Sequence, residues 1–171
     1  DLFPQGFSGA VDLCIDHHPS NLHYAGDTLL HAEKSACGEA VLELIELLTG
    51  SVTEQEANLL YIAVTTDTGC FQYANTNAAT LRAAARLLEL GADNRRVSME
   101  FFRKISRARM ALVGHIYSGM RFFRSGQIAI AVVTRALIDA LQATEDDCDD
   151  IAGLPGRADG VVVSVTIREL T

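Results

Sequence analysis

The feature that most constrains the fold is a largely apolar run that ends in three polar, chemically active residues. The run VDLCI occupies residues 11–15 and is followed at once by Asp16, His17 and His18. Such a short run, without strict alternation, favours a strand buried on both faces, as in a parallel sheet covered by helices. In open α/β sheets, ligands bind beyond the carboxyl ends of the strands, where these three side chains would project. The pattern predicts an α/β domain with a site at residues 16–18.

Helical periodicity follows this predicted strand. Gly50 closes the first helix, and Thr53 and Glu56 have the spacing of a capping box that opens the second. The second helix ends in a loop that starts at Asp67, and Asp93 can cap a fourth helix. A strand followed by helices, with polar residues in the loops, predicts a parallel sheet flanked by helices over residues 1–105. The predicted helices cover residues 35–49, 53–66, 76–90 and 93–102.

The character of the sequence changes after Ser106, which predicts a second unit. A connecting helix is expected over residues 106–120, and a second, smaller α/β domain over 121–171. This domain is predicted to hold strands at 127–133 and 161–167, the second of which has no partner strand beyond it in the sequence. Further features are a helix capped by Thr134, an acidic helix N-terminus at residues 145–150 that lacks the spacing of a calcium loop, and a turn at 153–156.

Composition limits the classes of protein that the chain can belong to. A chain of 171 residues that is 49% hydrophobic can bury one sizeable core or two smaller ones. The formal net charge of −8 argues against a protein that coats nucleic acid. No apolar run approaches the roughly 18–20 residues of a membrane-spanning helix, and no signal-peptide pattern opens the chain, so a cytoplasmic protein without membrane contact is expected. The four cysteines form no Cys-x-x-Cys pair and are predicted to be reduced thiols.

Imidazole and carboxylate groups together form the usual ligand set of divalent transition metals, including manganese. A second polar cluster strengthens this interpretation of residues 16–18. The segment YIAVTTDTGCFQY ends an apolar stretch in Asp67, Thr68 and Gly69, which again places a carboxylate at the edge of an apolar layer. The alternatives are that Asp16 caps a turn, with one histidine packed and the other solvated, and that Asp67 terminates a helix through an Asx turn. Phe71 and Tyr73 can either stack on a base or pack in the core.

In combination, the segments IDHHPSN and TTDTGCFQYAN resemble the third and fourth motifs of the DHH phosphoesterase family. The segment from about residue 121 is similar to the DHH-associated domain that follows in these proteins. The resemblance is greatest to the branch described as bifunctional oligoribonuclease and 3′-phosphoadenosine 5′-phosphate phosphatase. It implies that residues 1–105 are the C-terminal portion of a DHH phosphoesterase domain, and that 121–171 begin a substrate-binding domain.

The resemblance also implies roles for particular residues. His17 and Asp67 are expected to bind one Mn²⁺ ion, and Asp16 and His18 to act beside it or against the substrate phosphate. The sequence leaves open which of the two histidines is the ligand. Separately, a basic cluster can attract the backbone of a short oligonucleotide, although a solvated helix face is the simpler reading. This cluster comprises Arg103, Lys104, Arg107 and Arg109, of which Arg103 and Arg107 are predicted to bind substrate.

The chain departs from the family pattern in three places. The first two metal motifs and the glycine-rich substrate loop are not found, so we expect the chain to be a fragment of a longer protein that binds two Mn²⁺ ions, and to be inactive alone. The implied reaction is hydrolysis of short oligoribonucleotides or 3′-phosphoadenosine 5′-phosphate by a metal-activated water. The alternatives are a cyclic-dinucleotide phosphodiesterase, a single-strand exonuclease, a family II inorganic pyrophosphatase or a non-catalytic nucleotide-binding module. A homodimer is left open.

Overall fold

The computed structural model describes residues 10–170, which form two compact units divided after Arg103. Both units combine helices with parallel strands, so the predicted α/β class is confirmed. Among the described residues, no helix is both long and apolar enough to cross a bilayer. All four cysteines lie within this range and none forms a disulfide.

The predicted first strand is present, but it is less buried than expected. It is β1 (Leu13–Asp16), which pairs in parallel with β2 (Asp27–Leu30), and Asp16 is its last residue. Within β1 only Cys14 is buried and Leu13 is exposed, so the prediction of burial on both faces is wrong. The physical reason is the surroundings of the strand, because within the described chain β1 pairs with β2 alone and helix α1 (Cys37–Thr49) contacts it.

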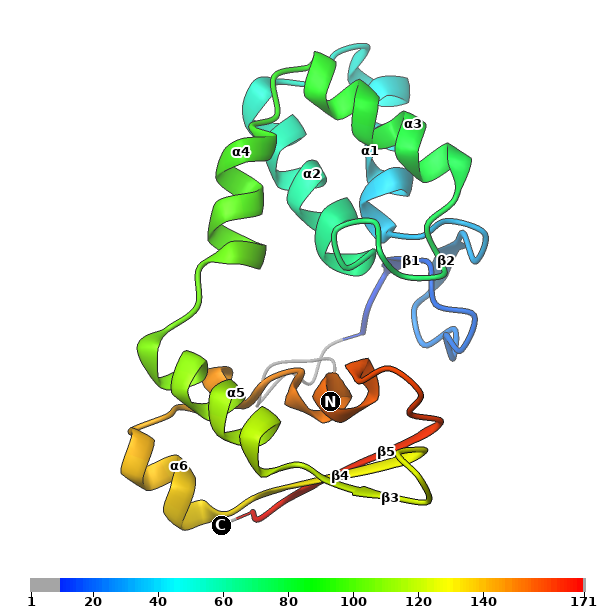
Figure 1. Cartoon of the computed structure of the whole chain (residues 1–171). Coiled ribbons are helices and arrows are strands. Elements are labelled where there is room, and N and C mark those ends of the chain that lie inside the picture. Colours follow the sequence, from blue (N-terminus) through cyan, green and yellow to red (C-terminus); the bar gives the residue numbers. More distant parts are fainter. Residues whose placement is uncertain (1–9, 171) are drawn as a thin grey trace. The chain divides into compact units, whose positions relative to one another are not determined.

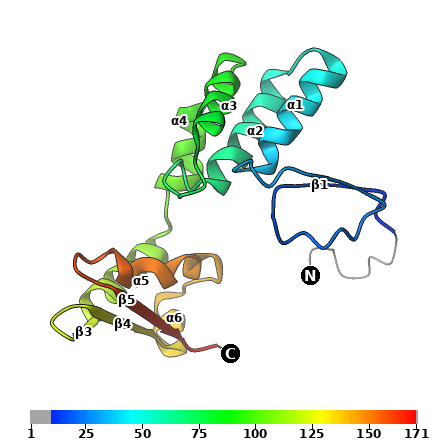
Figure 2. The ribbon, with the colours of Figure 1, turned by 90° about the vertical axis from the view of Figure 1, so that its right-hand side faces the viewer.

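Three helices form the core of the first unit, and Figure 2 shows them side by side. Helix α1 packs on α2 (Glu54–Asp67), and α2 packs on α3 (Ala78–Glu89). Buried apolar side chains fill the space between them, and the helix α4 (Asn94–Val97) contacts α2. The π-helix η1 (Ser98–Arg103) continues from α4. The core includes Leu42, Leu60, Tyr61, Val64 and Leu87.

Local signals placed three of the helix ends correctly, whereas α1 and α3 each begin two residues later than predicted. Gly50 closes α1 in the left-handed conformation, at φ 72°. Thr53 and Glu56 form the predicted capping box of α2, in which each side chain accepts from the backbone N–H of the other residue. Asp93 caps α4 by accepting from the backbone N–H of Arg96. These caps satisfy helix-end donors that would otherwise lack a partner.

The second unit is a three-stranded sheet covered on one face by helices (Figure 1). Its elements are α5 (Arg107–Gly119), β3 (Arg121–Phe123), β4 (Ile128–Val133), α6 (Arg135–Leu141), the 3₁₀-helices η2 (Asp146–Cys148) and η3 (Ile151–Arg157), and β5 (Val163–Arg168). Strand β4 is central, and it pairs antiparallel with β3 and parallel with β5. The buried residues of β4 alternate as Ala129, Ala131 and Val133, and helix α5 packs against this face through Leu112 and Ile116.

The second unit differs from its predicted organisation in three respects. The helix expected as a connector is α5, which belongs to the core of this unit because Leu112 and Ile116 are buried there. The acidic segment begins a single 3₁₀ turn, and the turn expected at residues 153–156 lies inside η3. On the sheet face opposite α5, β5 exposes Val163, Val165 and Ile167.

Candidate functional site

The centre of the candidate site is the ring of His17, which follows the last residue of β1. Its Nε2 atom lies 3.4 Å from Oδ2 of Asp67, at the end of α2. Its Nδ1 atom lies 3.3 Å from the carbonyl oxygen of Lys34. The side chain of His17 is 14% exposed and that of Asp67 is 40% exposed, so solvent can reach the pair from the Asp67 side. The two polar clusters singled out in the sequence therefore meet in space.

The contact between Nδ1 of His17 and the carbonyl of Lys34 determines what the other ring nitrogen, Nε2, can bind. Because a carbonyl oxygen only accepts, the contact is a hydrogen bond only when Nδ1 carries the proton. In the neutral ring Nε2 is then a bare acceptor that faces the carboxylate oxygen of Asp67. Nitrogen and oxygen ligands stand about 2 Å from a transition metal, so two ligands of one ion are at most about 4 Å apart. The 3.4 Å separation and the donor set both fit a shared divalent cation.

Asp16 and His18 form a second pair beside His17. Nδ1 of His18 lies 2.7 Å from Oδ1 of Asp16, and Oδ2 of Asp16 accepts from the side chain of Asn21 at 2.6 Å. The hydrogen bond from Asn21, and next the one from His18, hold the pKa of the Asp16 carboxyl well below its usual range. Asp16 also accepts from the backbone N–H of His17, so it organises the turn as well. The ring of His18 is 68% exposed.

Together, Asp16, His17 and His18 offer three ligand atoms that all lie within 4.8 Å of one another. Both oxygens of Asp16 already accept hydrogen bonds, and the ring of His18 faces Asp16. His17, by contrast, directs one nitrogen to a fixed carbonyl and the other to Asp67. The geometry thus favours His17 over His18 as the ligand, and favours a positioning or substrate role for Asp16 and His18. These roles remain predictions.

A strained turn holds Asp67 in place. Gly69, Cys70 and Phe71 all adopt positive φ angles, of 55°, 56° and 65°. The buried hydroxyl of Thr68 accepts from the backbone N–H of Phe71 and donates to the carbonyl of Val64. The alternative interpretation, an Asx turn made by Asp67, does not describe this turn, because the oxygen that accepts from the backbone N–H of Phe71 belongs to Thr68. Non-glycine residues with positive φ are costly, and such strain persists where the surrounding contacts enforce it.

The two aromatic residues after this turn have different surroundings. Phe71 packs against the core of the first unit, with its ring centroid 6.4 Å from that of Tyr61. Tyr73 is exposed, and its ring lies over Gly69. The core position favoured for both aromatic residues is therefore confirmed for Phe71, which packs against the core, and is wrong for Tyr73, whose ring is exposed.

Cys37 lies close enough to the site for the charges of Asp16 and Asp67 to affect the pKa of its thiol. Its thiol donates to the carbonyl of Ile15, and burial raises the pKa of the thiol, with the negative charges of Asp16 and Asp67 acting in the same direction. A raised pKa keeps the thiol protonated and a weak nucleophile. The arrangement therefore favours water over a cysteine as the attacking group.

The two predicted substrate-binding arginines lie in different units of the chain. Arg103 is exposed at the end of η1 in the first unit, and Arg107 is exposed at the start of α5 in the second. Arg109 of the same basic segment donates to the backbone carbonyls of Asp146 and Asp147, which is a structural contact. The substrate role of Arg103 and Arg107 remains a prediction.

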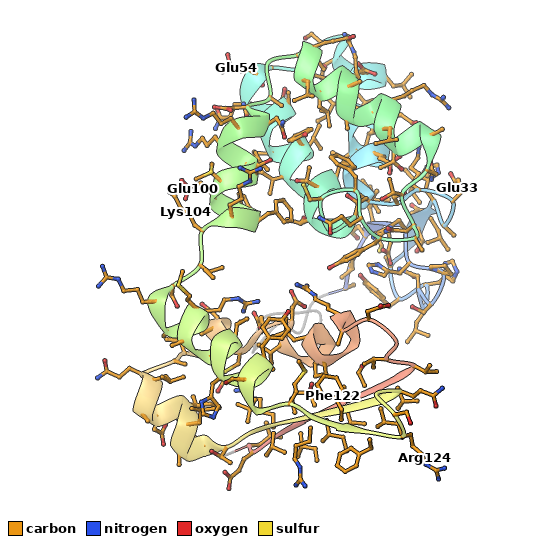
Figure 3. The ribbon with its side chains drawn as sticks, viewed as in Figure 1. Glu33, Glu54, Glu100, Lys104, Phe122 and Arg124 are labelled. Atoms are coloured by element: carbon orange, nitrogen blue, oxygen red, sulfur yellow. The ribbon has the colours of Figure 1, made fainter. Side chains whose placement is uncertain are left out.

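Two of the cavities on the described part of the first unit are large enough to compare as substrate sites. One, of about 540 Å³, lies beside the site and is lined by Asp16, His18, Asn21 and Tyr24 among others. The other, of about 850 Å³, lies between α2 and the segment formed by α4 and η1, where Figure 3 marks Glu54 and Glu100. None of the residues predicted for the site lines the larger cavity, so the smaller one is the better candidate for holding a substrate.

Sequence reasoning missed three residues that organise the site. Asn21 binds Asp16, while Asn75 and Ser35 connect the loop that carries Lys34 to the turn at Asp67. Asn21 and Asn75 are the last residues of the two quoted motifs, IDHHPSN and TTDTGCFQYAN. Their position at the ends of the motifs, together with a carboxamide that both donates and accepts, was the available signal.

Comparison with known proteins gives the relationships of the chain. It is 34% identical over 156 residues to the bifunctional oligoribonuclease and PAP phosphatase NrnA of Thermus thermophilus, covering 91% of this chain and 46% of that protein. It is 32% identical over 149 residues to the protein of the same name from Mycoplasma genitalium, covering 86% of this chain and 46% of that protein. The chain is related to the DHH phosphoesterases.

The chain spans about half the length of the DHH relatives it matches. A further relative is the Bacillus subtilis NrnA, which is 24% identical over 162 residues. That match covers 90% of this chain and 50% of that protein. The crystal structure of an exopolyphosphatase-related protein from Bacteroides fragilis matches with a TM-score of 0.84 at 24% identity, over 94% of this chain and 48% of that one. This match supports the fold. No protein-family model matches the chain.

Proposed function

We propose that the protein containing these residues is a manganese-dependent phosphoesterase that hydrolyses short oligoribonucleotides and 3′-phosphoadenosine 5′-phosphate. The observation that carries the proposal is the 3.4 Å separation between Nε2 of His17 and Oδ2 of Asp67, combined with the hydrogen bond that directs Nε2 toward that carboxylate. The names of the relatives, oligoribonuclease and PAP phosphatase, support the substrate class.

In this proposal His17 and Asp67 hold the metal. The carbonyl of Lys34 fixes the His17 tautomer, which keeps the metal-binding nitrogen free of a proton. Asp16 is ionised at neutral pH and orients the ring of His18 through Nδ1. When it is protonated, His18 can donate from Nε2 to a phosphoryl oxygen. Arg103 and Arg107 are proposed to bind the backbone of an oligonucleotide.

When bound, divalent ions would lower the pKa of a coordinated water and neutralise charge on the phosphate during in-line attack. The described residues supply part of what this reaction needs, namely the His17–Asp67 pair and a cavity beside it. No nucleophilic side chain is needed, in agreement with the protonated state of Cys37.

The test is hydrolysis by the full-length protein in the presence of Mn²⁺. The substrates are a dinucleotide RNA, 3′-phosphoadenosine 5′-phosphate, cyclic di-AMP and pyrophosphate, each followed by chromatography of the products. Turnover of the first two is expected. Turnover of cyclic di-AMP or pyrophosphate alone would replace the proposed substrate, and binding of all four without turnover would favour a nucleotide-binding module.

A cytoplasmic location and a homodimer complete the proposal. Activity on short RNA and nucleotides requires access to those molecules, which are cytoplasmic. A homodimer would double the mass of the full-length protein in sedimentation equilibrium, and a monomer mass would remove that part of the proposal while leaving the chemistry intact.

A further inference from the structure

We propose that Asn75 is a positioning residue that keeps His17 and Asp67 within reach of one metal ion. The inference rests on the proposed function, in which these two residues share the ion. His17 follows β1 and Asp67 ends α2, so nothing in the local backbone fixes their separation. A specific connection between the two segments is needed, and the side chain of Asn75 makes it.

The carboxamide nitrogen of Asn75 donates two hydrogen bonds. One goes to the carbonyl of Asp67 at 3.1 Å, and the other to the carbonyl of Ser35 at 3.2 Å. The carbonyl of Lys34, one peptide unit before that of Ser35, accepts from Nδ1 of His17. A short hydrogen-bonded path therefore runs from the imidazole of His17 through residues 34 and 35 to Asn75, and from Asn75 to the backbone of Asp67.

The Ser35 end of this path is anchored in the interior. Ser35 is 2% exposed, and its hydroxyl donates back to the carbonyl of Asn75, so the two residues bind each other in both directions. The same hydroxyl lies 2.6 Å from Oγ1 of Thr80. The buried carboxylate of Glu39 accepts from the backbone N–H of Ser35 and from Thr80. Buried polar networks that are fully satisfied are rigid, so Asn75 is held by a fixed support.

The chemistry of the connection requires an amide at position 75. Both acceptors are backbone carbonyls, so the bridging atom must carry two N–H groups, as a carboxamide nitrogen does. A carboxylate of the same shape would place oxygens against two carbonyl oxygens and lose both bonds. Groups that orient metal ligands typically contribute a factor of about 10–100 to metal affinity or activity.

The experiment measures binding of Mn²⁺ alone to the full-length protein, using loss of the electron paramagnetic resonance signal of free Mn²⁺. The variants are Asn75→Asp and Asn75→Ala, and the matched control is Asn77→Asp. Asn77 caps α3 by accepting from the backbone N–H groups of Ala79 and Thr80, and its amide donates to the hydroxyl of Ser35. An aspartate there keeps the cap and adds the same charge to the same loop. It gives up the bond to Ser35 but leaves both bonds donated by Asn75 in place.

Both Asn75 variants are expected to bind Mn²⁺ about 10–100-fold more weakly than the wild type, while Asn77→Asp stays within about twofold. Because His17 and Asp67 remain, saturating Mn²⁺ should restore kcat on a dinucleotide RNA in the Asn75 variants. Circular dichroism checks that each variant is folded.

Three outcomes would overturn the inference. If the wild type binds Mn²⁺ and the Asn75 variants bind it equally tightly, Asn75 has no positioning role and the proposed function stands. If the wild type does not bind Mn²⁺, the proposed function and the inference fail together. If both Asn75 variants are unfolded while Asn77→Asp is folded, the residue stabilises the unit rather than the metal pair.

Discussion

The carbonyl oxygen of Lys34 lies 3.3 Å from Nδ1 of His17, and this contact determines which nitrogen of the imidazole can bind a cation. When Nδ1 of the neutral ring donates to this carbonyl, Nε2 is left as an acceptor toward Asp67. A backbone carbonyl of this loop thus selects the ligand atom. Such a tautomer-fixing partner is a common feature of metal-binding histidines.

The first prediction concerns the two proposed ligands. In the full-length protein, His17→Ala and Asp67→Asn should each weaken Mn²⁺ binding and nearly abolish hydrolysis with the fold intact, because each removes one donor atom from the ion. Mn²⁺ titration and hydrolysis of a dinucleotide RNA measure the two effects. His31→Ala is the control, since its ring pairs with the exposed carboxylate of Glu33, a residue that Figure 3 labels. Unchanged activity in either ligand variant would refute its role.

The second prediction concerns the turn after Asp67. Gly69→Ala should lower the free energy of unfolding of the first unit by about 1–3 kcal/mol, from left-handed strain and overpacking. A Cβ at Gly69 would lie 2.4 Å from the ring of Tyr73, whereas one at Gly50 would meet nothing within 4 Å. Gly50→Ala should therefore cost only the strain, about 1 kcal/mol.

A double-mutant cycle in urea unfolding separates these two causes. With Tyr73→Ala present, Gly69→Ala should cost no more than Gly50→Ala does. An equal cost of Gly69→Ala with and without the Tyr73 ring would show that the ring does not constrain the turn.

The third prediction concerns the start of α2, the helix that carries Asp67. Thr53→Ala removes the hydroxyl that accepts from the backbone N–H of Glu56 and should destabilise the first unit by about 0.5–2 kcal/mol. Thr53→Ser keeps the acceptor and should leave the free energy of unfolding close to that of the wild type. Equal losses in the two variants would mean that packing of the threonine methyl, and not the cap, is responsible.

The fourth prediction concerns the pH dependence of the second unit. Hydrogen bonds from the hydroxyl of Ser106 first, and then from the backbone N–H of Thr144, lower the pKa of Asp147. The unfolded pKa of an aspartate is about 3.9, so the contribution of Asp147 to stability is fully present above that pH. It is lost as the pH falls through the lower, folded pKa.

Asp147→Asn should therefore be less stable than the wild type at pH 7, and the difference should shrink below about pH 4. Denaturation of the second unit at several pH values measures this. Asp159→Asn, in the exposed turn before β5, is the control and should show no such pattern. A difference between Asp147→Asn and the wild type that is constant across this range would contradict the assignment.

Local signals explain what the sequence could predict. Gly50, Thr53 and Asp93 act on neighbouring backbone groups, so their caps follow from spacing alone. The proximity of His17 and Asp67 was expected from the resemblance of their two motifs to those of the DHH phosphoesterases. Their metal-binding role is still to be tested.

Non-local contacts explain what could not be predicted. Strand β2 has only two apolar residues, Leu29 and Leu30, and becomes a strand by pairing with β1. The burial of β1 depends on the elements that pack on it, and the sequence of residues 11–15 does not specify those elements. Asn75 acts on the distant Ser35, a contact that only the folded chain reveals.

The central claim is tested most directly by a crystal structure of the full-length protein with Mn²⁺, using anomalous diffraction to locate manganese. The account predicts an anomalous peak within coordination distance of both Nε2 of His17 and a carboxylate oxygen of Asp67. A structure in which manganese binds elsewhere, or contacts only one of these two residues, would contradict it.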